Sequence, residues 1–193
     1  SNPMAIAVPC EGEPFVLDFA PCATLPTYVR YAKRYGDSLP EGVVHDAQGR
    51  PTTDPNQVND VAGHQTQFGA IAPSGNKGYG LLLAIDFLSG ALMGCAMGTD
   101  HATEAGALKG HCLMAIDPAM FGGAEAFRHA VSARLAQIKG SKVAPGHDGI
   151  RTPGERSFAT RERSLAEGRV TIDRVCWEDA LETAGELRVA APA

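Results

Sequence analysis

The chain has 193 residues, which suffice for one domain with a sizeable core or for the larger part of a two-domain enzyme. Its formal net charge of −5 excludes a general electrostatic attraction to nucleic acid or to an anionic membrane. An odd number of cysteines, mostly among apolar neighbours and without the close pairing of a zinc site, predicts reduced core thiols of a cytoplasmic protein and no metal centre: Cys10, Cys22, Cys95, Cys112 and Cys176.

The first residues predict two neighbouring strands and a helix. Met4 to Val8 and Phe15 to Phe19 are short apolar runs separated by a turn-like stretch that contains Pro and Gly. From Thr27 to Tyr35 the apolar and aromatic residues recur at helical spacing, and Gly36 is expected to end that helix. The chain is therefore expected to start with a strand pair followed by a helix.

Two contrasting segments follow. Residues 37 to 69 are mostly turn chemistry, and the irregular connection 49 to 55 is expected to be functional or to pack against another subunit. Tyr79 to Ala96 is apolar almost all round, which is typical of a buried core helix. Asp86 in its middle, together with several glycines, disfavours a membrane span.

The second half of the chain alternates between apolar runs and helical patterns. It predicts a strand at Cys112 to Ile116, an amphipathic helix at Ala124 to Ile138, a helix at Glu155 to Leu165, a strand at Val170 to Ile172 and a helix at Trp177 to Leu187. Strands interleaved irregularly with helices indicate an α+β or mixed α/β architecture.

Two cationic turns that contain glycine are candidate binding motifs. Gly75 to Gly80 opens the apolar helix and carries Lys77, so its backbone N–H groups and its cation suit an anion. Arg151 to Arg156 places two guanidinium groups around a Pro-Gly turn, which suits a phosphate or a carboxylate. The alternatives are tight helix packing with a solvated Lys77, and a surface turn in which the arginines pair with Glu155.

Seven motifs, these two among them, follow one another along the chain: Ser1–Pro3, Leu17–Ala20, Leu39–Gly42, Gly49–Pro55, Gly75–Gly80, Ala115–Pro118 with Phe121–Gly123, and Arg151–Arg156. In this order they resemble the malate/L-lactate dehydrogenase-like family, which lacks a Rossmann unit and includes ureidoglycolate dehydrogenase, sulfolactate dehydrogenase and the piperideine-2-carboxylate reductases. The resemblance runs from Ser1 to about Leu187 and covers only the C-terminal portion of that family.

The resemblance implies a mixed α/β fold with a large, mainly antiparallel sheet that is flanked by helices and completed by a missing N-terminal part. Residues 1–140 would carry the core sheet and the cofactor, and residues 141–193 would return to a helical dimerisation region. The implied partners are a small-molecule substrate, the missing N-terminal fragment or a companion chain, and a second copy in a homodimer, with neither nucleic acid nor membrane.

The resemblance also implies an NAD or NADP cofactor and a role for each matching residue. Ser1 would stand beside substrate and cofactor. The residues expected to contact the cofactor are Asp18, Phe19 and Ala20 at the nicotinamide, Asn76 and Lys77 in the cofactor turn, and Arg151, Pro153, Gly154, Glu155 and Arg156 beside the phosphates. The family's catalytic histidine would lie in the missing part, and no histidine of this chain inherits its role. His64, in the loop before Lys77, is the histidine to test first.

The chain departs from the family on the substrate side. Where the family continues through Thr-Ser to a Gly-Lys pair, this sequence has Pro21-Cys22 and then Pro26, Thr27 and Tyr28, which are candidate substrate-side residues. The cofactor turn has Asn76 where the family commonly has His, and it keeps the cation. The rewritten substrate loop leaves the identity of the substrate open.

The predicted function is that of an NAD(P)-dependent dehydrogenase or reductase for a small 2-oxo acid, 2-hydroxy acid or cyclic imine. The alternative is a self-processed amide hydrolase on the same scaffold, because an apolar run begins right after Ser1 without a start methionine. If a precursor were cut there, the Ser1 hydroxyl would be the nucleophile and its α-amino group the base. A companion chain and an arbitrary boundary are the other origins of this start. A third interpretation is an inactive interaction subunit.

Overall fold

The computed structural model describes residues 1–58, 69–98 and 110–190. The chain divides into two compact units, Ser1–Pro153 and Gly154–Ala193. None of the helices in the described part of the chain is both long enough and apolar enough to cross a membrane. The architecture combines helices with antiparallel sheets, which confirms the predicted mixed α/β class.

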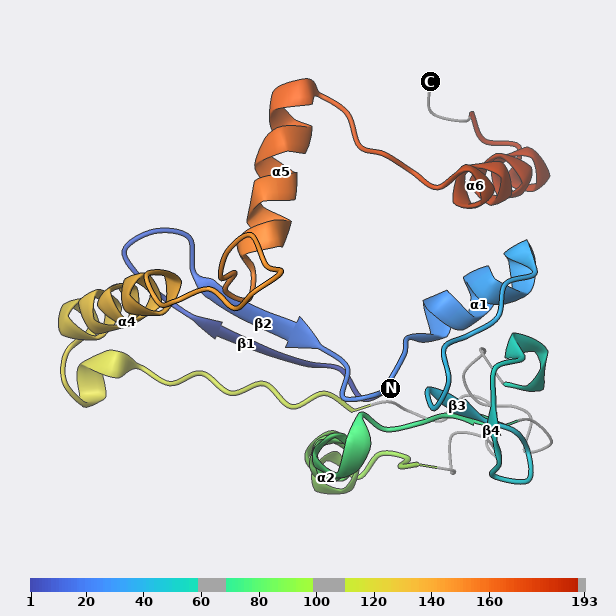
Figure 1. Ribbon diagram of the computed structural model, residues 1–193, viewed down its shortest axis with the longest axis horizontal. Helices are drawn as coiled ribbons and strands as arrows, with labels where there is room; N and C mark the ends of the chain where they lie inside the picture. Colours follow the sequence, from blue (N-terminus) through green and yellow to red (C-terminus); the bar gives the residue numbers. More distant parts are fainter. Residues whose placement is uncertain (59–68, 99–109, 191–193) are drawn as a thin grey trace. The chain divides into compact units, whose positions relative to one another are not determined.

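The first unit begins with an antiparallel ribbon of two strands, β1 (Met4–Val8) and β2 (Phe15–Phe19), at the residues that the sequence predicts. Met4 pairs with Phe19 and Val8 with Phe15. Pro9 and Pro14 bound the two runs, and because proline has no N–H group the ladder stops there. At the other, open end of the ribbon lies the N-terminus, and there the chain also leaves β2 for the first helix (Figure 1).

That helix, α1 (Pro26–Tyr35), confirms the predicted helix and its end. Pro26 occupies the first turn, where its missing N–H group is tolerated, and Gly36 ends the helix with a left-handed φ of 72°. Val29 and Ala32 face inward and pack in a small core with Leu39, Val44 and Val58. The Lys33 Nζ also donates a hydrogen bond of 2.8 Å to the Val58 carbonyl.

A small antiparallel sheet forms the other side of this core. Its strands are β4 (Pro51–Thr52), β3 (Val44–His45) and β5 (Ala70–Ile71), with β3 in the centre. The connection 49–55 therefore contains a short strand and leads into a 3-10 turn, η1 (Pro55–Gln57), which corrects its prediction as an irregular loop. Within the described residues the chain builds a ribbon and this sheet, so the large sheet that the resemblance implies is not formed by these strands alone.

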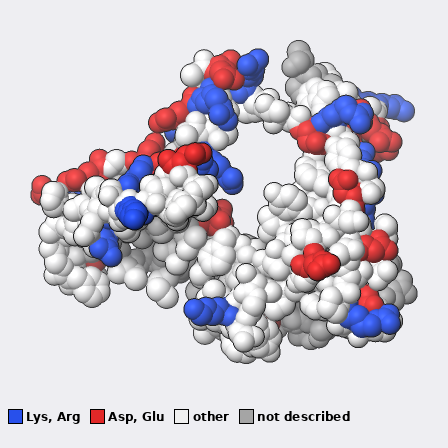
Figure 2. Space-filling view, in the orientation of Figure 1, with Lys and Arg blue, Asp and Glu red and all other residues white. Residues whose placement is uncertain are grey.

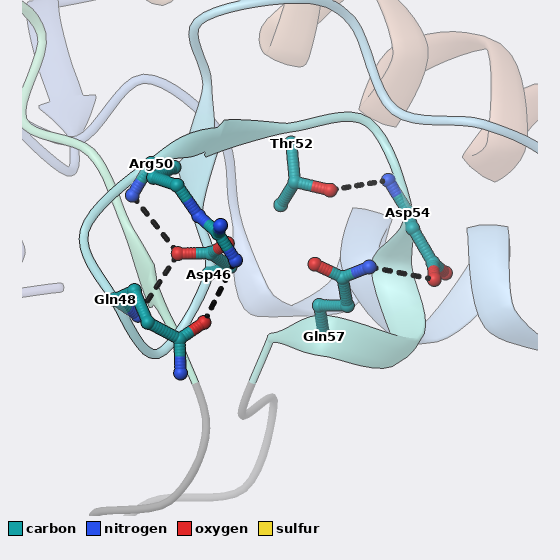
Figure 3. A network of polar contacts seen from close by, with 6 residues as sticks. All are labelled: Asp46, Gln48, Arg50, Thr52, Asp54 and Gln57. Atoms are coloured by element: carbon teal, nitrogen blue, oxygen red, sulfur yellow. Dashed lines mark hydrogen bonds and ion pairs between the residues drawn. The ribbon is translucent and has the colours of Figure 1, made fainter.

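Two carboxylates shape the β3–β4 turn and the turn after β4 (Figure 3). Asp46 accepts hydrogen bonds from the N–H groups of Arg50 and Gln48, both at 2.9 Å, and from the Arg50 Nε at 2.8 Å. The bond from the Arg50 N–H group is the main reason why the pKa of Asp46 lies below its ordinary value. Asp54 accepts from the Asn56 N–H group at 2.9 Å, which lowers the pKa of Asp54 in the same way.

The apolar helix of the sequence is α2 (Gly75–Ser89), followed by a 3-10 turn, η2 (Ala91–Met93). The helix begins at Gly75, in the glycine motif that was expected to open it, but the predicted extension of the apolar helix to Ala96 is wrong, because Gly90 ends it. The prediction that this helix is buried is also wrong. Gly78 is the one buried residue of α2, whereas Phe87 is 55% exposed. Over α2, Figure 2 shows a surface almost without charge apart from one cationic patch.

The rest of the first unit contains η3 (Pro118–Met120) and α4 (Ala124–Lys139). The helix confirms its prediction. The predicted buried strand Cys112–Ile116 is wrong, because this segment has no strand partner among the described residues and Leu113 is 96% exposed. Two contacts tie α4 to the loop between β1 and β2: Glu11 Oε1 lies 3.0 Å from His129 Nδ1, and the Glu11 N–H group donates to Ser132 Oγ at 2.9 Å.

The second unit contains α5 (Glu155–Glu167) and α6 (Arg174–Leu187). Both helices were predicted, although α6 begins earlier than expected because Asp173 Oδ1 caps it by accepting from the Val175 N–H group. The predicted strand Val170–Ile172 is wrong, since these residues form the irregular connection between the helices. Three alternating residues are too few to define a strand. The predicted core position of the cysteines is also wrong, because Cys112 and Cys176 are exposed and the other three are only half-buried.

Candidate functional site

The open end of the β1–β2 ribbon meets the beginning of α2. The Ser74 N–H group donates to the Pro21 carbonyl at 3.0 Å, and the Ala23 N–H group donates to the Ala72 carbonyl at 2.8 Å. Between these bonds Cys22 and Pro73 form an antiparallel bridge. The chain that leaves β2 therefore runs against the chain that enters α2, although about fifty residues separate them in the sequence.

Gly78 makes this close approach possible. A Cβ atom at this position would lie 2.6 Å from the Pro21 carbonyl oxygen, nearer than real Cβ atoms come to a backbone atom. Gly78 is buried, whereas the next glycine of the motif, Gly80, has nothing within 4 Å of its own Cβ direction. The first of these two glycines is thus required by packing.

A second contact comes from the beginning of the chain. The Asn2 Nδ2 donates to the Leu82 carbonyl of α2 at 2.8 Å. Together with the pairing of Met4 and Phe19, this contact fixes the start of β1 and the end of β2 at the same part of α2. The structure therefore attaches two of the segments that the sequence singles out, Ser1–Asn2 and Asp18–Ala20, to α2, the helix whose first turn contains Asn76–Lys77.

The first turn of α2 is open to an anion. Ser74 precedes the helix without capping it through its side chain. The Gly75 N–H group donates to the Pro73 carbonyl at 2.8 Å, which leaves the next N–H groups of the turn as candidate donors to an anion. Gly75 has a φ of 64°, and its Cβ direction points into open space. Asn76 and Lys77 are exposed beside these groups. Backbone donors, the helix dipole and one full cation thus act on the same small region.

The substrate-side candidates follow directly in the chain. Pro26, Thr27 and Tyr28 form the first turn of α1, three to five residues after the bond from Ala23 to Ala72. The Tyr28 side chain is 63% exposed, and the Thr27 Oγ1 accepts a long hydrogen bond of 3.5 Å from the Arg30 Nη2. Thr27 and Tyr28 are thus exposed on the surface of the unit, and Pro26 is half-buried.

The second cationic motif is divided between the two units. Arg151 is exposed in the first unit, and the Pro153 carbonyl accepts a bond of 3.3 Å from the Val16 N–H group of β2. In the second unit, Gly154 has a φ of 93° and precedes α5, whose first residues are Glu155 and Arg156. A groove along α5 is lined by Arg156, Arg161 and Arg169 together with the hydroxyl groups of Ser157, Thr160 and Ser164.

Comparison with known proteins gives a match to the family model for malate/L-lactate dehydrogenase over residues 1–180. The chain belongs to the malate/L-lactate dehydrogenase family. The match covers nearly the whole chain and includes every segment of the site described above.

Three relatives illustrate the range of this family. The Δ(1)-pyrroline-2-carboxylate reductase of Pseudomonas fluorescens is 36% identical over 93% of this chain and 51% of its own length. The NAD(+)-dependent ureidoglycolate dehydrogenase of Escherichia coli O157:H7 is 31% identical over 91% of this chain and 49% of its own. The solved structure of the sulfolactate dehydrogenase from Methanocaldococcus jannaschii is 33% identical, covers 97% of this chain and 52% of its own, and has a TM-score of 0.72.

The chain spans about half the length of the curated relatives it matches. Membership of the malate/L-lactate dehydrogenase family therefore fixes the fold to which these segments belong. The role of each site residue stays a prediction, as does the division at residue 140. His64 lies outside the described residues.

The sequence-based interpretation missed the part that Asn2 plays. This residue was noted only as a member of the motif Ser1–Pro3, and its contact joins positions 80 residues apart. A signal was present, because asparagine is among the few residues that adopt a left-handed backbone readily, and Asn2 has a φ of 43°. The pair of His129 and Glu11 was missed as well, since no spacing in the sequence links a hairpin loop to a distant helix.

Proposed function

We propose that this chain carries the cofactor-binding and substrate-binding side of an NAD(P)-dependent oxidoreductase for a small 2-oxo acid, 2-hydroxy acid or cyclic imine. One observation carries the proposal: in a chain of this family, Pro21 after β2 lies against Gly78 and Asn2 before β1 donates to the Leu82 carbonyl, so both strands are attached to α2 close to its first turn.

The residues at the junction fit a nicotinamide nucleotide. The first turn of α2 offers backbone donors and Lys77 for a phosphate group, and its glycine leaves room for the approach. Phe19 and Ala20 are half-buried apolar residues at the end of β2, and the Phe19 ring would offer an apolar contact to the nicotinamide. The bound nucleotide would supply or accept the hydride. The Ser1 hydroxyl would hold a polar group of substrate or cofactor by a hydrogen bond.

The names of the relatives support the substrate class. Sulfolactate, ureidoglycolate and pyrroline-2-carboxylate are all small carboxylates, and each carries a carbon that gains or loses a hydride beside the carboxylate. We propose a substrate of the same kind for this protein. Pro26, Thr27 and Tyr28 are the residues that would distinguish among such acids, because they depart from the family at an exposed helix start.

The proposal is tested by fluorescence titration of the protein with NADH and with NADPH. We expect one of the two to bind in the micromolar range and Lys77→Ala to weaken it by about 1.5 to 3 kcal/mol, because a charge-assisted contact is lost. Lys142→Ala removes an exposed cation of the connection after α4 and is the control. Equal affinity of the Lys77→Ala variant and the wild type would contradict the role of Lys77.

The same titration separates the alternatives. A hydrolase that uses Ser1 and an inactive interaction subunit would each bind neither nucleotide. No observation in the structure favours the hydrolase, which stays a prediction from the sequence. A wild-type protein that oxidises or reduces one of the three acids above with the bound nucleotide would confirm the proposed reaction class.

A further inference from the structure

Asn2 has an unusual backbone and an unusual partner. Its φ of 43° lies in the left-handed region, which among the described non-glycine residues is shared only by Arg188. Its half-buried side chain reaches across the fold, where Nδ2 donates to the Leu82 carbonyl at 2.8 Å. The left-handed turn directs the chain from Ser1 into β1. The hydrogen bond from the side-chain amide of Asn2 fixes this turn against α2.

Asn2 and Pro21 both lie just beyond the open end of the ribbon. The last pair of the ladder is Met4 with Phe19, and Asn2 is two residues before Met4 while Pro21 is two residues after Phe19. Pro21 contacts α2 at Gly78, and Asn2 contacts it at Leu82. These two residues are four positions apart and lie on the same face of the helix, about 6 Å from each other along its axis.

The open end of the ribbon is thus held on α2 at two points one helical turn apart. The hydrogen bonds of Pro21 and Ala23 with Ser74 and Ala72 act on the β2 side of the ribbon only. Without the bond from Asn2, the start of β1 could pivot about these contacts and change its distance from the first turn of α2. The bond from Asn2 removes this rotation. Ser1 precedes Asn2 directly, and Phe19 and Ala20 precede Pro21, so each of them moves with the ribbon.

We infer that Asn2 is a positioning residue: it fixes the separation between Ser1 and the end of β2 on one side and Lys77 on the other. The inference rests on the proposed function, in which these groups hold one ligand together. Reacting groups displaced by about 1 Å lose much of their effect on a bound ligand. Asparagine suits the position because it combines tolerance of a left-handed backbone with an N–H donor, a pair of properties that neither glycine nor aspartate has.

The test compares Asn2→Asp and Asn2→Gly with the wild type. Both variants keep a backbone that can turn to the left, and both lack the donor to Leu82. We expect each to bind the preferred reduced nucleotide, NADH or NADPH, about tenfold more weakly, the change that corresponds to one net hydrogen bond. Asn56→Asp is the control. It removes an amide donor of the same kind, 3.0 Å from Asp54 Oδ1, outside the proposed site.

Hydrogen exchange supplies a readout that does not depend on the function. Loss of the second attachment point should raise exchange in α2 and in the β1–β2 ribbon, and leave α1 as it is. Unchanged exchange in Asn2→Asp would overturn the inference even if the protein is active. Faster exchange with wild-type nucleotide affinity would also overturn it, since Asn2 would then be merely structural.

The two failures are distinguishable. A wild type that binds neither NADH nor NADPH would sink the proposed function and the positioning role together. A wild type that binds, with Asn2 variants that bind equally well, would sink the positioning role alone. Faster exchange together with weaker binding in both Asn2 variants, and neither in Asn56→Asp, is the result that we expect.

Discussion

Two regions of the first unit have similar apolar composition and opposite packing. In the α1–β3 core, formed by Val29, Ala32, Leu39, Val44 and Val58, every side chain is at most 6% exposed. On the α2 surface, formed by Tyr79, Leu81, Leu83, Phe87 and Leu88, every side chain is at least 36% exposed. The first region is covered by neighbouring segments of the same chain, whereas no described segment covers the second.

The difference shows that a sequence can indicate which side chains are apolar enough to be buried, but not always what buries them. The apolar residues of α1 lie on one side of the helix, and the small sheet that covers them follows within 37 residues of its end. The residues of α2 are apolar on almost all sides, so the sequence predicts that these side chains are buried. It does not indicate which segment or which other polypeptide buries them. The candidate site lies where these two regions are joined, between Pro21 and Ser74.

The largest expected effect comes from truncating one apolar side chain in each region and comparing the free energies of unfolding. Val29→Ala should lower the free energy of unfolding by about 2 to 3 kcal/mol, because two fully buried methyl groups are lost and a cavity remains. Leu88→Ala, at a side chain that is 47% exposed, should lower it by less than about 1 kcal/mol. Urea denaturation of the two variants beside the wild type measures both effects.

A large effect of Leu88→Ala would break the comparison. If this variant were destabilised as much as Val29→Ala, the α2 surface would be covered in solution, by another copy of the chain or by another polypeptide. Repeating the denaturation at several protein concentrations would then identify an association, since the stability of an oligomer rises with concentration.

The second prediction concerns the junction of the two regions. Gly78→Ala should destabilise the protein by about 1 to 2 kcal/mol, because the added Cβ meets a backbone oxygen that cannot move aside easily. Gly80→Ala is a matched control in the same helix, with open space around its Cβ direction. It should stabilise by about 0.5 to 1 kcal/mol through helix propensity alone. Thermal unfolding that ranks the two variants in the reverse order would contradict the packing of α2 on Pro21.

The sequence predicted the elements that have local causes. The ribbon strands are bounded by prolines, α1 by Pro26 and Gly36, and the beginning of the apolar helix by its glycine motif. It could not predict the strands β3, β4 and β5, because two-residue strands carry no periodic pattern and form only when distant segments meet. The strand predicted at Cys112–Ile116 does not form, because this apolar run has no neighbouring strand to pair with in the described chain.

For the candidate site the same division holds. The resemblance implies that Lys77, Asp18 and Ser1 belong to one site, which stays a prediction. The contacts of Pro21 and Asn2 attach the segments that carry Asp18 and Ser1 to α2, the helix of Lys77. Those contacts could not be read from the sequence, since each joins a side chain or carbonyl to a backbone atom far along the chain. The sequence shows a glycine at position 78, but only the structure shows why a larger residue would not fit there, which is the Pro21 carbonyl oxygen beside it.

The smallest effect is expected in the β3–β4 turn, beside the α1–β3 core and away from α2. The pKa of Asp46 is lowered in the folded protein, first by the hydrogen bond from the Arg50 N–H group. A carboxyl group with a lowered folded pKa stabilises the fold above its unfolded pKa of about 3.9, and this contribution is lost as the pH falls through the folded value. Asp46→Asn should therefore be less stable than the wild type at pH 7.

The difference between the two proteins should shrink as the solution becomes more acidic than about pH 4, because the wild-type carboxyl group then takes up its proton and loses its charge. Urea denaturation at a series of pH values from 7 downward measures this convergence. Asp148→Asn, at an exposed carboxylate of the connection after α4, is the control for the loss of one negative charge. A difference for Asp46→Asn that stays constant into acid would mean that the turn is held by the shape of the side chain and not by its charge.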